Sequence, residues 1–257
     1  MQICLLLVQF IANITKLLLT ILMSGHSKWA TTKRAKESND FKRSGLFTKL
    51  AKAIAIAARD GGDPEMNFKL RMAIDRAKKM SLPKDNIERA IKTGTGDNGG
   101  TAIEEITYEG YGPGGIALII ETITDNKNRT VGEVKHTLSK LGGNLGGSGN
   151  VAWMFDRKGV IYLEETSLTD EQELIIIDSG AQDIIKDDES IIVYTADTDL
   201  HKVKDVLEKN NFNIAESKLE FVPKDKAVVE NEEKVLKIMD ALDDLDDVQN
   251  VYTNADI

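Results

Sequence analysis

The order of sequence patterns between residues 158 and 225 is the strongest constraint on the fold. Short apolar runs typical of strands alternate there with two helix-like segments, in the order β-α-β-β-α-β. This order is the ferredoxin-like motif. The six segments are GVIYLE, TDEQELIIIDSG, AQDIIKDD, SIIVYTA, DTDLHKVKDVLEKNN and FNIAESKLEFVP. We therefore predict a ferredoxin-like domain over residues 158–225.

Segments on either side of this domain indicate a second sandwich. Before it, IEEITYEG and GIALIIETIT predict a hairpin across the turn YGPGG, followed by the helix NRTVGEVKHTLSKLGG and a third strand, VAWMFDR. After it come a helix, NEEKVLKIMDALDDL, and a strand, VQNVYTN. Together these parts supply two helices and one sheet. We predict a discontinuous ferredoxin-like domain over residues 98–157 and 226–257, with the other domain inserted into it.

Residues 23–97 have a helical period instead. Leu50 and Ile54 lie on the apolar face of a first helix that ends at Gly61-Gly62. We expect Asp63-Pro64 to cap and start a second helix, and SLPKDNIERAIKTG predicts a third. The predicted fold class is therefore α+β: an N-terminal three-helix domain followed by two ferredoxin-like α/β sandwich domains, the third inserted into the second.

The first 22 residues, MQICLLLVQFIANITKLLLTIL, are apolar with Lys16 as their one charge. A signal peptide has a basic start and a small-residue cleavage site, and neither is clear here. A spanning helix needs about 20 mostly apolar residues, a length reached here only by including several polar ones. Met23 offers a third account, in which translation begins there. We expect residues 1–22 to be an apolar extension outside the fold, with an anchor or a signal as the alternative.

Charge divides the chain into two unlike parts. The net charge is -9, yet residues 24–100 hold 17 Lys and Arg against 9 Asp and Glu. Residues 101–257 hold 15 against 33. Such asymmetry indicates an anionic partner at the N-terminal end, which the acidic part would repel and help to orient. Many soluble domains have a similar excess of basic residues without binding nucleic acid, so charge alone leaves the question open.

The segment GHSKWATTKRAK is the basic arm in which nucleic-acid chemistry is most concentrated. Lysine and arginine neutralise phosphates, hydroxyl groups bond to phosphate oxygens, and a tryptophan stacks on an unpaired base. The candidate contacts in the arm are His26, Ser27, Lys28, Trp29, Lys33, Arg34 and Lys36. The alternative is that Trp29 fills the helical core while the basic groups face solvent.

The first helix adds a second set of candidate contacts. At 100° per residue, one stripe of this helix is basic and adjoins its apolar face. The stripe consists of Lys42, Lys49, Lys52 and Arg59, and Arg43 lies beside it.

Nothing in the sequence points to catalysis or to a cofactor. His26, His136 and His201 are far apart, and Cys4 is the one cysteine, so no zinc-ligand spacing occurs. Glycine patterns such as GYGPGG lead into strands and not into helices, which is the wrong order for a dinucleotide site. The acidic run 243–247 lacks the alternation of a calcium loop and predicts a solvated helix end.

Three long stretches closely resemble the YebC/PmpR family, whose mitochondrial relatives include the translational activator of cytochrome c oxidase. They are SGHSKWATTKRAK, the segment from FTKLAKAIAIAARDGG to IERAIKTGTG, and the segment from YEGYGPGG to WMFDRKG. The resemblance begins at Met23, where members of the family typically start. It implies three domains, a cytoplasmic location, and no enzymatic activity, cofactor or small-molecule substrate. If translation starts at Met23, no membrane association is expected.

Two functions follow from the resemblance. The family is commonly described as DNA-binding transcriptional regulators, whereas some members look like translation factors that act on the ribosome and relieve stalling. In either case the basic arm and helical domain would contact the nucleic acid, DNA or ribosomal RNA. Against DNA, no clear helix-turn-helix recognition helix is visible. The chain also departs from the family after the tryptophan, where ATTKRAK is less basic than usual and leaves the fine nucleic-acid preference open.

Overall fold

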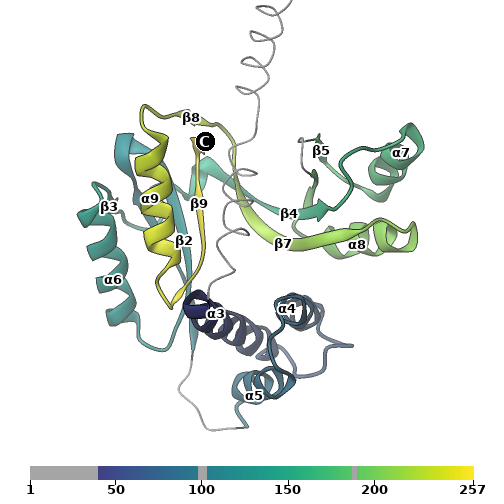
Figure 1. Cartoon of the computed structure of the whole chain (residues 1–257), viewed down its shortest axis with the longest axis horizontal. Coiled ribbons are helices and arrows are strands. Elements are labelled where there is room, and N and C mark those ends of the chain that lie inside the picture. The colour runs from purple at the N-terminus through teal and green to yellow at the C-terminus, as the bar shows by residue number, and fades with distance from the viewer. Residues whose placement is uncertain (1–39, 98–102, 187–189) are drawn as a thin grey trace, which may run out of the picture.

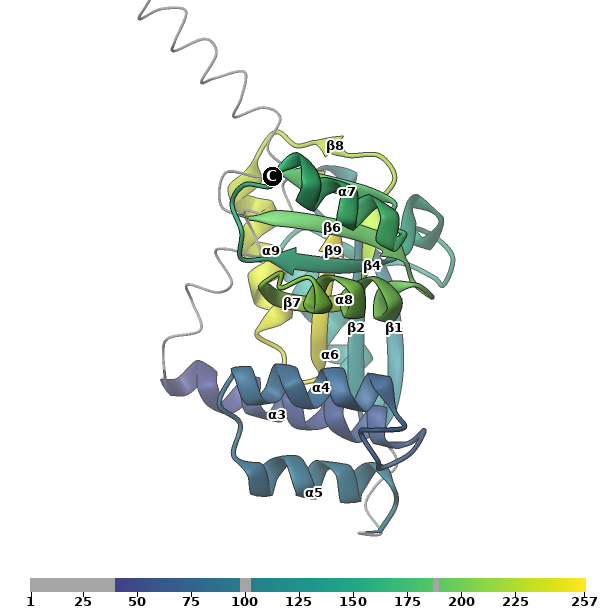
Figure 2. The same ribbon diagram turned by 90° about the vertical axis from the view of Figure 1, so that its right-hand side faces the viewer.

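The structure is a computed structural model that describes residues 40–97, 103–186 and 190–257 (Figures 1 and 2). Helices at the N-terminal end lie against two separate sheets, and each sheet is covered by two helices. No helix in these ranges is long and apolar enough to cross a membrane.

Three helices share one apolar core at the N-terminal end, as the sequence predicts. They are α3 (Asp40–Ala58), α4 (Phe68–Lys79) and α5 (Lys84–Gly94). Apolar residues recur on each helix at helical spacing, and the buried set includes Leu50, Ile54, Leu70, Ile74 and Ile87. Burial of these side chains is the main force that holds the three helices together.

The start of α4 differs from the prediction. Asp63-Pro64 was expected to cap the helix, but α4 begins after Asn67, whose side-chain oxygen accepts a hydrogen bond from the Leu70 N–H at 3.1 Å. The Asn67 amide also donates to the carbonyls of Ala57 and Gly61, at 2.7 and 2.8 Å. Asn67 therefore satisfies both the new helix and the loop that precedes it, which the Asp-Pro pair does not do.

The first sheet has the strand order β3-β1-β2-β9, so the C-terminal strand β9 pairs with a strand from the middle of the chain. Its elements are β1 (Glu104–Tyr111), η1 (Pro113–Gly115), β2 (Ala117–Thr124), α6 (Lys127–Lys140), β3 (Asn144–Leu145), α9 (Glu232–Asp243) and β9 (Val248–Thr253). The β1–β2 hairpin turns through Gly114 and Gly115, both at a φ of 78°, where glycine is favoured. Helices α6 and α9 lie side by side on one face of the sheet (Figure 1).

The second sheet has the order β5-β6-β4-β7, with every neighbouring pair antiparallel. Its elements are β4 (Phe155–Leu163), α7 (Asp170–Ser179), β5 (Asp183–Lys186), β6 (Ile191–Ala196), α8 (Leu200–Lys209) and β7 (Ile214–Pro223). The first and third strands of the motif lie at the centre, as the ferredoxin-like motif requires. The inserted domain therefore has the predicted element order, and the α+β fold class is confirmed.

One predicted domain boundary needs correction. A division between residues 157 and 158 would cut β4, which is a single strand from Phe155 to Leu163. We therefore place the start of the inserted domain at Phe155. A short parallel pair, β8 (Ala227–Val228) with β10 (Ala255–Asp256), follows the return of the chain to the first domain.

The segment VAWMFDR was expected to be the third strand of the first sheet, and this prediction is wrong. Its residues Ala152–Met154 form a short 3-10 helix, η2, and the rest begins β4 of the other sheet. The carboxylate of Glu109 accepts backbone N–H bonds from Gly149, Val151 and Ala152, at 2.6, 2.7 and 2.8 Å. These bonds curl the chain away from the first sheet, so the two-residue strand β3 completes that sheet instead.

Strand β2 is buried on both faces, which explains why GIALIIETIT is an almost continuous apolar run. Leu118 and Ile120 point into the core beneath α6 and α9. Ala117 and Ile119 point to the opposite face, where Phe155 of β4 packs against them. The two sheets are therefore joined through an apolar contact.

Candidate nucleic-acid interface

The arm residues predicted to contact nucleic acid lie outside the described residues. They are His26, Ser27, Lys28, Trp29, Lys33, Arg34 and Lys36. Lys42 and Arg43 belong to α3, but only the backbone of α3 is described at these two positions. The roles of all nine residues stay predictions.

Two lysines of the predicted stripe contact the first sandwich domain. Lys49 donates to the backbone carbonyl of Asp243, and its ammonium nitrogen lies 3.4 Å from the Asp243 carboxylate. Lys52 donates to the carbonyl of Asp246 at 3.1 Å and to the carboxylate of Asp247 at 2.6 Å. The two lysine side chains are only 14% and 20% exposed. They hold α3 against the C-terminal end of α9, where cations are favoured by the helix dipole.

Asp247 is the centre of this contact. Its carboxylate is 2% exposed and accepts hydrogen bonds from Lys52 at 2.6 Å, Arg129 at 2.7 Å and Thr130 at 2.7 Å. Burial disfavours the charged carboxylate, but the bonds from Lys52, Thr130 and Arg129 outweigh burial and lower its pKa to about 2. The prediction of a solvated acidic helix end is therefore wrong for Asp247, which joins α3, α6 and the turn before β9.

Arg59 is the third described member of the stripe. Its guanidinium donates to the carbonyl of Ile103, at 3.3 Å, just before β1 begins. Unlike Lys49 and Lys52, Arg59 is exposed, and its contact is with a backbone carbonyl and not with a carboxylate. Of the three members whose side chains are described, one has its charge open to solvent and two are engaged between domains.

Helix α4 contacts the inserted domain in a similar way. Lys79 donates to the carbonyls of Ile214 and Ala215 on β7, at 2.8 and 2.7 Å. Arg76 lies 3.3 Å from the carboxylate of Glu216 on the same strand. These contacts hold α4 along β7.

An aromatic contact with α8 adds to the docking of α4. The ring of Phe68 stacks on the ring of His201, with centroids 4.0 Å apart. The guanidinium of Arg71 lies 3.4 Å from the His201 ring nitrogen and 5.5 Å from the centre of the Phe68 ring. His201, which the sequence presents as an ordinary helical histidine, is thus part of the contact between the two domains.

The remaining described cations of the helical domain are open to solvent on other surfaces. Besides Lys79, the exposed basic side chains of α4, α5 and the loop between α3 and α4 are Arg59, Lys69, Lys78, Lys84, Arg89 and Lys92. Of these residues, only Arg59 was predicted from the sequence to contact nucleic acid. The helical period of SLPKDNIERAIKTG, which turns Ile87 and Ala90 inward, would have placed Arg89 and Lys92 outward.

Metal chemistry finds no support among the described residues. No group of three or more His, Cys, Asp or Glu is placed there to hold an ion. His136 lies on α6 and His201 on α8, in different domains.

Fold and charge together define the class: a three-domain α+β protein whose basic helical domain is held by ion pairs against two more acidic sandwich domains. Residues 27–97 match the family model for the TACO1/YebC protein N-terminal domain, and residues 103–255 match the model for the TACO1/YebC second and third domain. The chain belongs to the TACO1/YebC family.

Similar proteins agree with this assignment. A protein of Thermoanaerobacter pseudethanolicus is 49% identical over 240 residues, which cover 91% of this chain and 98% of that one. A protein of Chlorobaculum tepidum is 50% identical over 240 residues, which cover 91% and 96%. Both carry the name "probable transcriptional regulatory protein". The chain is therefore related to proteins named as regulators of gene expression.

A solved structure shares the fold. The crystal structure of a conserved hypothetical protein from Aquifex aeolicus superposes with a TM-score of 0.78 at 43% sequence identity. The match covers 84% of this chain and 91% of that one.

Proposed function

We propose that this protein binds nucleic acid as a regulator of gene expression and acts as a DNA-binding transcriptional regulatory protein. The observation that carries the proposal is the charge division: 17 basic against 9 acidic residues in 24–100, and 15 against 33 in 101–257. Basic groups release counterions from phosphates, while the acidic sandwiches keep the nucleic acid at the N-terminal end. The printed names of the relatives support transcription as the process.

The arm is the principal contact in this proposal. Lys49 and Lys52 already face Asp243 and Asp247, so binding of a phosphate by either lysine would leave a carboxylate behind. The Asp247 carboxylate is buried, and a buried carboxylate that loses its cationic partner is strongly unfavourable. Lys33, Arg34 and Lys36 form the basic core of the arm, and we assign them the largest share of the affinity.

A second candidate is a translation factor that binds ribosomal RNA on the ribosome. It is favoured by the surface of α5, where acidic Asp85 and Glu88 alternate with Lys84, Arg89 and Lys92. Such a helix does not present a uniformly basic face to a DNA major groove. Scattered cations suit folded RNA, which proteins recognise mainly by shape and phosphate contacts.

In either role we propose a cytoplasmic protein that acts by binding, without catalysis, a cofactor or a small-molecule substrate. No constellation of catalytic groups is found in the sequence, and the regulatory names of the relatives are in line with this.

Reversal of the arm charges tests the shared part of the proposal. The variant Lys33→Glu/Arg34→Glu/Lys36→Glu should bind duplex DNA and ribosomal RNA at least 100-fold more weakly in about 50 mM salt, because three phosphate contacts become repulsive. Its circular dichroism and melting temperature should match the parent protein. Unchanged affinity at low salt would exclude the arm as the contact.

Sedimentation of the native protein from a lysate then separates the two candidates. Co-migration with ribosomes that is lost after RNase treatment would favour the translation factor. Migration near the top of the gradient, together with sequence-dependent retention of promoter DNA at physiological salt, would favour the transcriptional regulator.

A further inference from the structure

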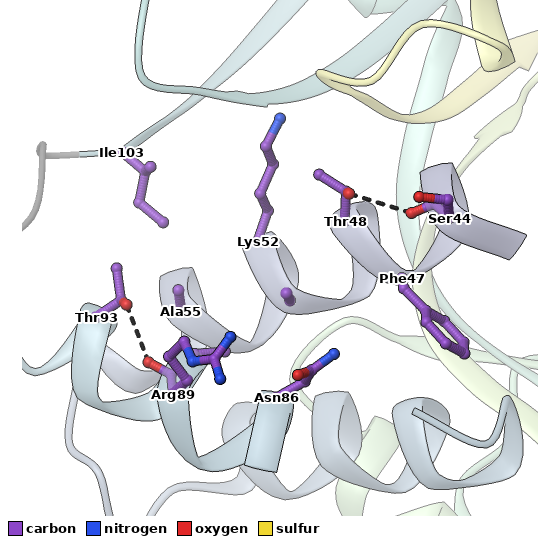
Figure 3. Close-up of a pocket in the computed structure, with 11 residues that line it drawn as sticks. Ser44, Phe47, Thr48, Lys52, Ala55, Asn86, Arg89, Thr93 and Ile103 are labelled. Carbon is purple, nitrogen blue, oxygen red and sulfur yellow. Dashed lines mark hydrogen bonds between the residues drawn. The ribbon is translucent and has the colours of Figure 1, made fainter. Parts of the chain in front are cut away.

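A groove lies between α3 and α5, on the side of the helical domain where Ile103 leads into β1 (Figure 3). Its volume is about 470 Å³, which is within the range of sites that hold a small ligand or one unit of a polymer. It is an open trough and not an enclosed cavity. An extended polymer chain could therefore lie across it while one unit of the polymer enters.

The floor of the groove is lined by alanines, which make it apolar and, because they are small, leave it open. Ala51 and Ala55 come from α3, and Ala90 comes from α5. At one end Gly94 brings the two helices together: a Cβ at this position would lie 2.1 Å from the carbonyl oxygen of Ala55. Beyond this close approach the alanines leave the space between the helices unfilled.

The rim of the groove offers hydrogen-bond donors and positive charge. Asn86 and Arg89 project from α5 and supply the donors, while the Thr48 hydroxyl on α3 donates to the carbonyl of Ser44 at 3.1 Å (Figure 3). Arg89 is exposed and forms no ion pair with a carboxylate in the described ranges of the chain. Lys52 also borders the groove, but its ammonium group points to Asp247. No carboxylate is among the described residues that line the groove.

We propose that this groove receives one nucleotide of the bound nucleic acid, with Arg89 on a phosphate and the base against the alanine floor. The inference rests on the proposed nucleic-acid binding, in the form of the second candidate, which binds RNA, and it adds a second contact to that of the arm. An apolar floor with a cationic, donor-rich rim is complementary to an unpaired nucleotide, which has a flat base and an anionic backbone. The basic arm of the chain itself is a poorer occupant, because its charge has the same sign as that of Arg89.

The test compares two charge reversals on one helix. Arg89→Glu changes a residue of the groove, whereas Lys92→Glu makes the same change at an exposed position of α5 that does not line it. The probe is a fluorescein-labelled 20-nucleotide single-stranded RNA of mixed sequence, with duplex DNA of the same sequence in parallel, in about 100 mM salt. Arg89→Glu should weaken RNA binding about tenfold, and Lys92→Glu by no more than about twofold.

A third variant tests the space and not the charge. Thr48→Trp places a large side chain at an exposed position on the rim, so it should occupy the groove without unfolding the protein. We expect it to weaken RNA binding about tenfold with an unchanged melting temperature. Equal effects of Arg89→Glu and Lys92→Glu, or full affinity of Thr48→Trp, would overturn the proposal.

A photo-reactive amino acid at Thr93, on the groove wall, identifies the occupant directly. Cross-linking to the RNA probe supports the proposal, whereas cross-linking to residues 23–39 of the same chain would show that the arm fills the groove and would overturn it. The arm reversal Lys33→Glu/Arg34→Glu/Lys36→Glu separates the two proposals. If it abolishes binding while the groove variants bind normally, only the groove inference fails; if it binds normally, the arm is excluded as the contact. The proposed function itself fails if the parent protein binds neither probe.

Discussion

Lys52 on α3 donates to the buried carboxylate of Asp247 at 2.6 Å, although the two residues are 195 positions apart in the sequence. Asp247 also binds Arg129 of α6 at 2.7 Å. One carboxylate therefore holds two cations, one from the helical domain and one from the sandwich that contains Asp247. The basic surface of the helical domain serves the internal architecture as well as any external partner.

Replacement of Asp247 should reveal the strength of this contact. Asp247→Asn keeps the shape of the side chain but removes the charge that Lys52 and Arg129 share. Because both cations are then left without their common buried partner, we expect a loss of about 2 kcal/mol in the free energy of unfolding. Urea denaturation followed by circular dichroism measures the change. Asp244→Asn is the matched control, since Asp244 lies one turn away and is exposed; a loss equal to that of Asp247→Asn would contradict the assignment.

The same carboxylate predicts a dependence of stability on pH. The pKa of Asp247 falls from 3.8 to about 2 in the folded protein, so folding favours the charged form. Its contribution, about 2 kcal/mol, is therefore complete above pH 4 and disappears as the pH falls from about 4 to about 2. The difference in unfolding free energy between the parent protein and Asp247→Asn should shrink over this interval. A difference that stays constant from pH 5 to pH 2.5 would show that Asp247 titrates normally.

The element order was predictable because each element is encoded locally. The hairpin before α6 follows from a glycine-rich turn between apolar runs, and the β-α-β-β-α-β segment follows from its alternation of periods. The near-continuous apolar run in β2 also indicated a strand, since Leu118 and Ile119 point to opposite faces that are both buried. The second face of β2 is buried only because the second sheet packs against it.

What the sequence did not predict depends on contacts between distant residues. Glu109 redirects the chain by binding the N–H groups of Gly149, Val151 and Ala152, which no local pattern indicates. In the candidate site, the period of α3 correctly places Lys49 and Lys52 side by side. Period alone cannot show that they face Asp243 at the end of α9 and Asp247 in the turn after it. A charged stripe is the same in sequence whether its partner is a phosphate or another domain.

Removal of the two interdomain lysines distinguishes these partners. In Lys49→Ala/Lys52→Ala the contacts with Asp243 and Asp247 are lost, so the helical domain should separate more readily from the first sandwich. Partly exposed ion pairs contribute about 0.2–1 kcal/mol each, and the pair with buried Asp247 contributes more. We expect faster proteolytic cleavage between α5 and β1 in the variant than in the parent protein. The two cleavage rates should differ less in 1 M salt, because salt screens the ion pairs of the parent protein.

Nucleic-acid affinity of the same double variant is the complementary readout. If the arm carries the binding, the affinity should stay within about twofold of the parent protein, because these lysines are engaged internally. A loss of tenfold or more, equal to the effect of the arm reversal, would instead show that the stripe leaves its carboxylates and contacts phosphate.

Two glycines in helices offer a final contrast between close packing and open space. Gly94 ends α5 against α3, where an added Cβ would lie 2.1 Å from the Ala55 carbonyl oxygen and 2.7 Å from the Ala58 Cβ. Gly94→Ala must push α5 away from α3, so it should lower the free energy of unfolding by about 2 kcal/mol or more. Gly132 lies inside α6 with nothing within 4 Å of its Cβ position, so Gly132→Ala should raise it by about 0.5–1 kcal/mol through helix propensity. Denaturant unfolding of the two variants measures the expected loss and the expected gain in the free energy of unfolding. A Gly94→Ala protein as stable as the parent would mean that the two helices do not approach so closely in solution.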